Sequence, residues 1–422
     1  MCGPARRIHQ RWYRDQEGRA CGLARQLRLK RRRVSQTLPA TRLPAAKAHS
    51  RRLAGNADQL DLRPRLKPQY TWWSDPADAD GVEELHFASA QRRLRITGRS
   101  LREFERVVMP LLDGSFTVEE VAAAAAPVFA AADVRASLDL LAQQRVLEFV
   151  PGDAPGLRPS DAFFHELGVE AAAVSKRLAR ATVAVFGLTG AGAEAAVRLA
   201  ASGVGHIRCV DDGAVDAADA VLSPLLSLGV GASRADAVSQ LAGRFGSTIL
   251  GYTLPLATDD DVRAAIRGVD FVVCALDVGW SSLIYKLNRA CLAERVPWTI
   301  GTLAGAEVIL GPTVQPYETA CFMCYRMRAI ACAESPEDEM ALERVLDQRK
   351  SDDSASRENL PFGAGILGNL LGLEALKALS GVLPPSALGS IVVTNLVRLT
   401  TSQHVVLRKP WCPDCFPGPP GP

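Results

Sequence analysis

The chain has 422 residues, enough for two or three domains of ordinary size. Its hydrophobic content of 48% and charged content of 23% are those of a globular protein, and no apolar run reaches the ~20 residues of a membrane span. Residues 1–68 hold 18 Lys and Arg against 4 Asp and Glu, which leaves a net charge of −11 on the rest. An acidic body argues against nucleic-acid binding.

The first 62 residues are rich in arginine and alanine and show no sustained hydrophobic periodicity. We expect a disordered arm, because basic runs such as Lys30 to Arg33 generally stay solvated. A tail that binds nucleic acid or an anionic surface is the alternative. The segment lacks the apolar core of a signal peptide, so we expect a cytoplasmic protein. A short disordered tail is expected at residues 417–422.

Residues 63–150 have the pattern of a winged-helix domain. An extended, proline-punctuated stretch with Trp72 and Trp73 leads into it. Thr117-Val-Glu-Glu120 has the form of a capping box, which opens a helix. The predicted elements are strands at 85–88 and 94–97, helices at 101–112, from 117 onward and at 133–144, and a strand at 146–150.

A winged helix can bind DNA or capture a peptide. The third helix, ADVRASLDLLAQQR, carries two aspartates beside its two arginines, whereas a DNA recognition helix needs clustered Lys and Arg. We therefore favour peptide capture, in which an extended segment joins an exposed sheet edge as a strand. A domain used only for packing, and gene regulation through DNA, are the alternatives. The residues expected to form the peptide site are Arg93, Leu94, Arg95, Ile96, Leu138 and Leu141.

A Gly/Pro-rich linker at residues 151–159 precedes a second domain at residues 160–416. Short apolar runs there alternate with helical segments at the spacing of βαβ units. The predicted strands lie at 183–186, 206–210, 247–253, 270–277 and 298–300. The fold class is therefore α/β, with a mainly parallel, doubly wound Rossmann-type sheet.

The first βαβ unit of this domain has a glycine-rich turn. Its first strand runs into Gly187-Leu-Thr-Gly190-Ala-Gly192, and its second strand ends on Asp211 and Asp212. Glycine lets a nucleotide approach the backbone closely, the following helix N-terminus suits a phosphate, and an acid there suits a ribose hydroxyl. The alternative for Asp211, and for Asp277 at the end of a later predicted strand, is that these polar strand ends cap neighbouring helices.

The chain has ten cysteines and no export signal, a combination that suggests metal ligation rather than disulfides. Two CxxC pairs, Cys321/Cys324 and Cys412/Cys415, offer the four thiolates that zinc prefers in closed structural sites. Because 87 residues separate the pairs, the site would fasten the C-terminal segment onto the domain. No histidine accompanies the set, which argues against a catalytic zinc. Four ordinary or redox-active cysteines are the alternative.

The glycine turn, the Val-Asp-Asp strand end, the strand ending in Asp277 and the two CxxC pairs together resemble the ThiF/MoeB-like adenylating proteins, relatives of ubiquitin-activating enzymes. The resemblance spans about residues 160–416. It implies that the turn and Asp211 hold ATP, that Asp277 binds magnesium, and that the four cysteines hold one structural zinc ion. It also implies a homodimer. Some members use a cysteine as a thioester nucleophile, and Cys332 is either that or an ordinary cysteine.

This chain departs from the family at the adenylation machinery. The adenylating members carry an Asn-x-x-Arg-Gln element whose arginine neutralises phosphate charge in the transition state. Here Asp219, Leu222 and Ser223 stand at those positions, and Arg234 stands near the usual catalytic lysine. Leucine cannot donate to a phosphate and aspartate repels it. We therefore expect no carboxylate activation, and we do not expect ATP or Mg²⁺ to be working cofactors.

The string RPRLKPQYTWW, the winged-helix pattern and the fused ThiF-like domain resemble the Ocin-ThiF-like leader-peptide-binding proteins of thiazole/oxazole-modified peptide (TOMM) biosynthesis. The resemblance implies that the small domain, a RiPP recognition element, binds the leader of a ribosomally made precursor. The precursor core would then pass to a separate YcaO-type cyclodehydratase for azole formation. The alternative is an active adenylating enzyme that acts on the C-terminus of a peptide or carrier protein. We expect neither a nucleic acid nor a membrane as partner.

Overall fold

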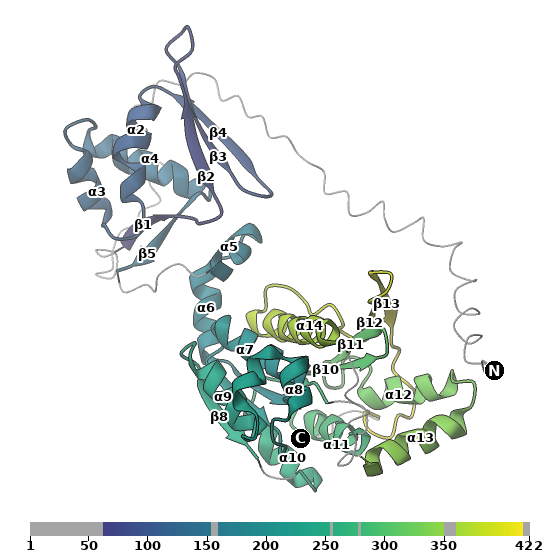
Figure 1. Cartoon of the computed structure of the whole chain (residues 1–422). Helices are drawn as coiled ribbons and strands as arrows, with labels where there is room; N and C mark the ends of the chain where they lie inside the picture. The colour runs from purple at the N-terminus through teal and green to yellow at the C-terminus, as the bar shows by residue number, and fades with distance from the viewer. Residues whose placement is uncertain (1–61, 153–158, 254–255, 277–279, 350–359, 417–422) are drawn as a thin grey trace, which may run out of the picture. The chain divides into compact units, whose positions relative to one another are not determined.

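A computed structural model describes residues 62–152, 159–253, 256–276, 280–349 and 360–416 (Figure 1). The chain divides into two compact units, Met1–Pro155 and Gly156–Pro422. The basic arm, most of the predicted linker, Asp277 and the C-terminal tail lie outside the described residues.

The first unit combines small antiparallel sheets with short helices, in agreement with the predicted winged-helix class. One sheet has the order β2-β3-β4, and a separate antiparallel pair joins β1 to β5. The elements are β1 (Leu62–Leu66), β2 (Thr71–Asp75), β3 (Glu83–Ala88), β4 (Arg93–Gly98), α2 (Leu101–Val107), the 3-10 helix η3 (Met109–Leu111), α3 (Val118–Ala125), α4 (Ala131–Gln143) and β5 (Leu147–Pro151).

Local sequence explains most of these boundaries. The capping box at Thr117 is formed in both directions with Glu120, so α3 begins where the sequence predicted. The helix predicted at 101–112 is instead α2 followed by η3, because Pro110 cannot donate the backbone bond that would continue an α-helix. Alternate residues of β3, Leu85 and Phe87, enter the core of the unit, as expected for a strand with one buried face.

The second unit is built on a sheet with the order β13-β12-β11-β10-β9-β6-β7-β8. Its strands are β6 (Thr182–Phe186), β7 (His206–Val210), β8 (Thr248–Tyr252), β9 (Phe271–Cys274), β10 (Trp298–Ala304), β11 (Glu307–Val314), β12 (Ser390–Asn395) and β13 (Thr400–Val405). The strands from β10 to β8 run parallel, as predicted, whereas β11, β12 and β13 continue the sheet in antiparallel pairs.

Helices cover both faces of this sheet (Figure 1). They are α5 (Pro159–Glu166), α6 (Ala171–Arg180), α7 (Gly190–Ala201), α8 (Ala217–Leu222), α9 (Arg234–Gly243), α10 (Asp259–Ile266), α11 (Ser281–Ala293), α12 (Phe322–Ala331), α13 (Pro336–Arg349) and α14 (Pro361–Ser380). In β6, Val183 and Val185 pack into the core under α7 and α14, while Ala184 and Phe186 pack into the core under α10 and α11. The predicted doubly wound fold is therefore confirmed.

Helix α14 is long and apolar enough to cross a membrane, judged by length and composition alone. In this structure it lies against α7 and the sheet, and 44% of its most apolar 18-residue window is buried. Gly368 permits the close approach, because a Cβ there would lie 2.5 Å from the carbonyl oxygen of Ala191. The apolarity of α14 is thus explained by its place in the core of the unit.

Candidate functional site

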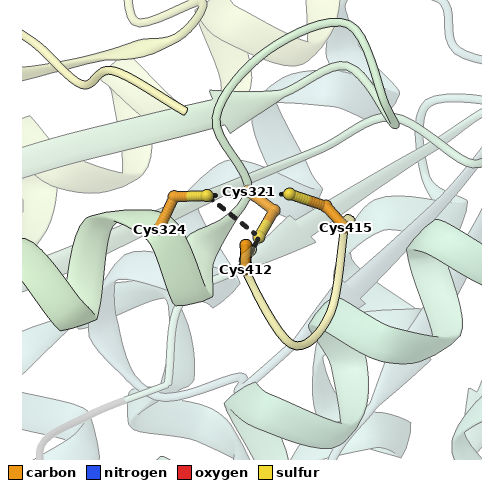
Figure 2. Close-up of side chains that lie close together, drawn as sticks. All are labelled: Cys321, Cys324, Cys412 and Cys415. Atoms are coloured by element: carbon orange, nitrogen blue, oxygen red, sulfur yellow. Dashed lines mark hydrogen bonds between the residues drawn. The ribbon is translucent and has the colours of Figure 1, made fainter. Parts of the chain in front are cut away.

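The two CxxC pairs meet in one buried cluster (Figure 2). Cys321 caps the start of α12 and Cys324 lies in its first turn, whereas Cys412 and Cys415 come from the loop after β13. The Sγ atom of Cys321 lies 3.8 Å from that of Cys324 and 3.6 Å from that of Cys412. The Sγ atom of Cys324 lies 3.6 Å from that of Cys415. Zinc–sulfur bonds of about 2.3 Å give a tetrahedron with edges of about 3.8 Å. The cluster can therefore hold a metal ion.

A shell of hydrogen bonds holds these cysteines in place. The Asn288 amide, on α11, accepts from the backbone N–H of Phe322 at 3.0 Å and donates to Asp414 at 2.6 Å, so one buried side chain contacts both cysteine segments. The backbone N–H of Lys409 donates to the Cys324 sulfur at 3.3 Å. The thiol of Cys321 and this N–H lower the pKa of Cys324, although burial alone would raise it. These contacts favour the thiolate form of Cys324, whereas burial raises the pKa of Cys415.

Sequence reasoning did not single out Asn288, because it lies on a helix remote from both CxxC pairs and no local pattern marks it. We expect Asn288→Ala to weaken metal binding about 10- to 100-fold, since the two cysteine segments lose their shared support. Competition with a chromophoric chelator measures this affinity. Asn369→Ala, which changes an exposed asparagine on α14, is the matched control. An unchanged affinity in Asn288→Ala would rule out the positioning role.

The glycine-rich turn lies where predicted, between β6 and α7. Gly187 has a φ of +78°, and a Cβ there would lie 2.8 Å from the carbonyl oxygen of Ala275. A Cβ on Gly192 would lie 1.7 Å from the carbonyl oxygen of Gly187. A Cβ on Gly190 would lie 2.9 Å from the Cβ atoms of both Leu222 and Ala364. The packing of the chain itself therefore requires glycine at all three positions, whether or not a nucleotide binds.

The carboxylate of Asp211 forms hydrogen bonds and an ion pair within the chain itself. It accepts from the backbone N–H groups of Leu188 at 2.7 Å and Gly213 at 2.8 Å, so it ties the glycine turn to the end of β7. It also pairs with Arg234 at 3.4 Å, and Arg234 Nε donates to Asp219 at 2.7 Å. Burial alone would lower the pKa of Arg234, but the two carboxylates raise it above its ordinary value. A fully charged arginine thus bridges the buried Asp219 and the half-buried Asp211.

The residues at the positions of the Asn-x-x-Arg-Gln element also make contacts within the chain itself. Leu222 is buried next to Gly190, and the Ser223 hydroxyl donates to Glu194 at 3.0 Å. The structure thus brings Gly187, Gly190, Gly192 and Asp211 together, whereas Asp277 lies outside the described residues. The sequence placed Arg234 near the usual lysine position but gave no sign that it pairs with Asp211, 23 residues away.

Among the described residues of the first unit, β4 is an edge strand. The Arg93 and Arg95 side chains are exposed, whereas Leu94 and Ile96 are half-buried against the core. Arg92, which directly precedes β4, donates to the Gln144 side chain at 3.3 Å and so ties the strand to the end of α4. The two leucines proposed to face the peptide, Leu138 and Leu141, are 1% and 2% exposed and lie in the core beneath.

The profile of the ThiF family matches residues 162–414. The chain belongs to the ThiF family. It is similar to the HesA protein of Leptolyngbya boryana, with 26% identity over 243 residues that cover 57% of this chain and 79% of HesA. It is also similar to the molybdopterin-synthase adenylyltransferase of Escherichia coli, with 24% identity over 55% of this chain and 86% of that protein.

Two solved structures share the arrangement of this ThiF-family chain. Escherichia coli MccB in its structure with ATP has a TM-score of 0.56 and 16% identity, over 83% of this chain and 99% of MccB. The heterocyclase TruD has a TM-score of 0.53 and 19% identity, over 84% of this chain and 43% of TruD. At these identities the likeness establishes the fold. Both matches extend beyond the ThiF-family residues into the rest of the chain.

Proposed function

We propose that this ThiF-family protein binds the leader of a ribosomally synthesised precursor peptide and presents the core to a separate YcaO-type cyclodehydratase. The observation that carries the proposal is the edge strand β4. Among the described residues, no strand pairs with its outer side, so its backbone groups there can bind an extended segment. The shared fold supports it, since MccB has been solved in complex with N-formylated MccA and TruD is a heterocyclase. Residues 63–150 would be the recognition element and residues 160–416 the scaffold.

The internal ion pairs at the glycine turn support a scaffold rather than an adenylating enzyme. Arg234 is committed to Asp211 and Asp219, and Leu222 offers no donor to a phosphate. The alternative, an enzyme that adenylates the C-terminus of a peptide or carrier protein, is favoured by the MccB fold, which has been solved with ATP. ATP–pyrophosphate exchange by the purified chain would establish that alternative.

We further propose that the cysteine cluster holds zinc in a structural role. A four-sulfur set leaves no open coordination position for a substrate, and it joins the C-terminal segment to α12. A homodimer formed by the ThiF-like unit and a cytoplasmic location complete the proposal.

The direction in which each backbone N–H group of β4 points gives the sharpest test of peptide capture. The hydrogen bond from Ser89 N–H to the Arg92 carbonyl marks the first bonded pair of the β3–β4 hairpin. Because bonded and non-bonded pairs alternate in an antiparallel ladder, the N–H groups of Arg93, Arg95 and Thr97 point away from β3. These are the groups that an added strand would use.

We expect Thr97→Pro to weaken binding of the leader peptides encoded beside this gene by about tenfold, because an outward N–H is lost and the ring obstructs the added strand. The fold should persist, since proline is tolerated at an edge strand where the N–H faces solvent. Fluorescence anisotropy with labelled leader measures the affinity of the full chain. Thr97→Val keeps the N–H and is the matched control. Leader binding that is equal in both variants, or absent from the wild type, would refute the proposal.

A further inference from the structure

The edge strand β4 and its flanks carry a concentrated positive charge. Four arginines, Arg92, Arg93, Arg95 and Arg99, lie between residues 92 and 99 with no acidic residue among them, although the chain beyond residue 68 is acidic as a whole. Arg95 pairs with Glu84 at 3.2 Å across the outer face of the sheet, where both side chains are partly exposed. Exposed ion pairs contribute little to folding stability, so the carboxylate of a bound peptide can compete for the Arg95 guanidinium.

Other arginines of this edge face no carboxylate among the described residues of the unit. Arg92 donates to Gln144, and Arg93 donates to the backbone carbonyls of Ser89 and Arg92. The exposed Arg99 guanidinium, just after β4, has no hydrogen-bond or ion-pair partner in this part of the chain. The charge along β4 is therefore only partly compensated.

The two faces of β4 differ in character. Arg93, Arg95 and Thr97 lie on the outer face and are exposed, whereas Leu94 and Ile96 lie on the inner face and are half-buried against the core. A strand added to this edge places its alternate side chains beside these same two faces. Its outer residues meet arginines, and its inner residues meet leucine and isoleucine.

We propose that the β4 edge selects an extended peptide segment in which acidic residues alternate with apolar ones. The inference rests on the proposed function and specifies the chemistry of the segment bound. The acidic residues lie opposite Arg93 and Arg95, and the apolar residues lie opposite Leu94 and Ile96. The basic N-terminal arm of the chain, which has the same sign of charge as this edge, is a poor occupant.

Four synthetic peptides with Gly/Ser flanks test the proposal against the full chain. One alternates Leu with Glu, a second alternates Leu with Gln, a third alternates Leu with Lys, and a fourth has the Leu and Glu residues in separate blocks. We expect the alternating Leu/Glu peptide to bind at least tenfold more tightly than the Leu/Lys peptide. We expect its advantage to shrink as salt is raised, because exposed charges are screened.

Charge reversal supplies the matched variants. In Arg93→Glu/Arg95→Glu, the preference should invert, so that the Leu/Lys peptide binds more tightly than the Leu/Glu peptide. Arg106→Glu, which reverses the charge of an exposed arginine on α2, should keep the original order.

Two results would overturn the inference. Equal affinity for the Leu/Glu and Leu/Gln peptides would show that the edge does not prefer acidic residues. Equal affinity for the alternating and block peptides would show that the alternation does not matter. In either case, encoded leader that still binds in a manner sensitive to Thr97→Pro would leave the proposed function standing. Absence of leader binding as well would remove both.

Discussion

Cys412→Ala is expected to abolish stoichiometric metal binding and to lower the free energy of unfolding of the second unit by more than about 3 kcal/mol. A structural zinc site contributes about 10–16 kcal/mol of apparent binding free energy in small zinc-finger peptides, and its loss removes that contribution from the folded state. Here the site joins two segments 87 residues apart, so the C-terminal loop also loses its attachment to α12. Metal analysis by mass spectrometry and thermal unfolding measure the two effects.

Cys332→Ala is the control for this prediction. Cys332 is exposed, follows α12 directly and lies outside the cluster, so its replacement should leave metal content and stability unchanged. A Cys412→Ala protein that retained one metal ion per chain would show that the four cysteines do not form the metal site.

Arg234→Met is expected to destabilise the second unit by about 3–5 kcal/mol, because two carboxylates, Asp211 and Asp219, then remain in the interior without their cation. Methionine keeps much of the volume of the side chain, so the loss of stability reflects the missing charge rather than a cavity. A change of this size lowers the thermal midpoint by about 10 °C in a domain of this length. Thermal and urea unfolding measure it.

Arg244→Met provides the comparison for the same chemical change. Arg244 is exposed at the C-terminal end of α9, the helix that Arg234 begins, so its loss should change stability by less than about 0.5 kcal/mol. If Arg234→Met were as stable as Arg244→Met, the bridge between the two aspartates would not be a structural element. The glycine-turn region would then be open to a nucleotide-binding role.

The sequence determined those features that depend on neighbouring residues. Apolar runs, glycines and capping residues act within a few positions, so β6, β7, α3 and the glycine turn lie where predicted. The two CxxC pairs also predicted which four cysteines the structure brings into one cluster, because the spacing within each pair is local and four thiolates together suit one zinc ion. Even the break between α2 and η3 has a local cause, Pro110, which lacks the backbone N–H that would continue the helix.

Only the tertiary structure decided what meets across long separations. The pairing of Arg234 with Asp211, and the contact of Asn288 with both cysteine segments, depend on how strands and helices are stacked. Helical spacing marked one apolar face of α4, but it could not tell a surface that meets a peptide from one that meets the core. Leu138 and Leu141 lie in the core because they belong to one buried cluster with Leu85 and Phe87 of β3 and Leu147 of β5, which excludes water from that face of α4.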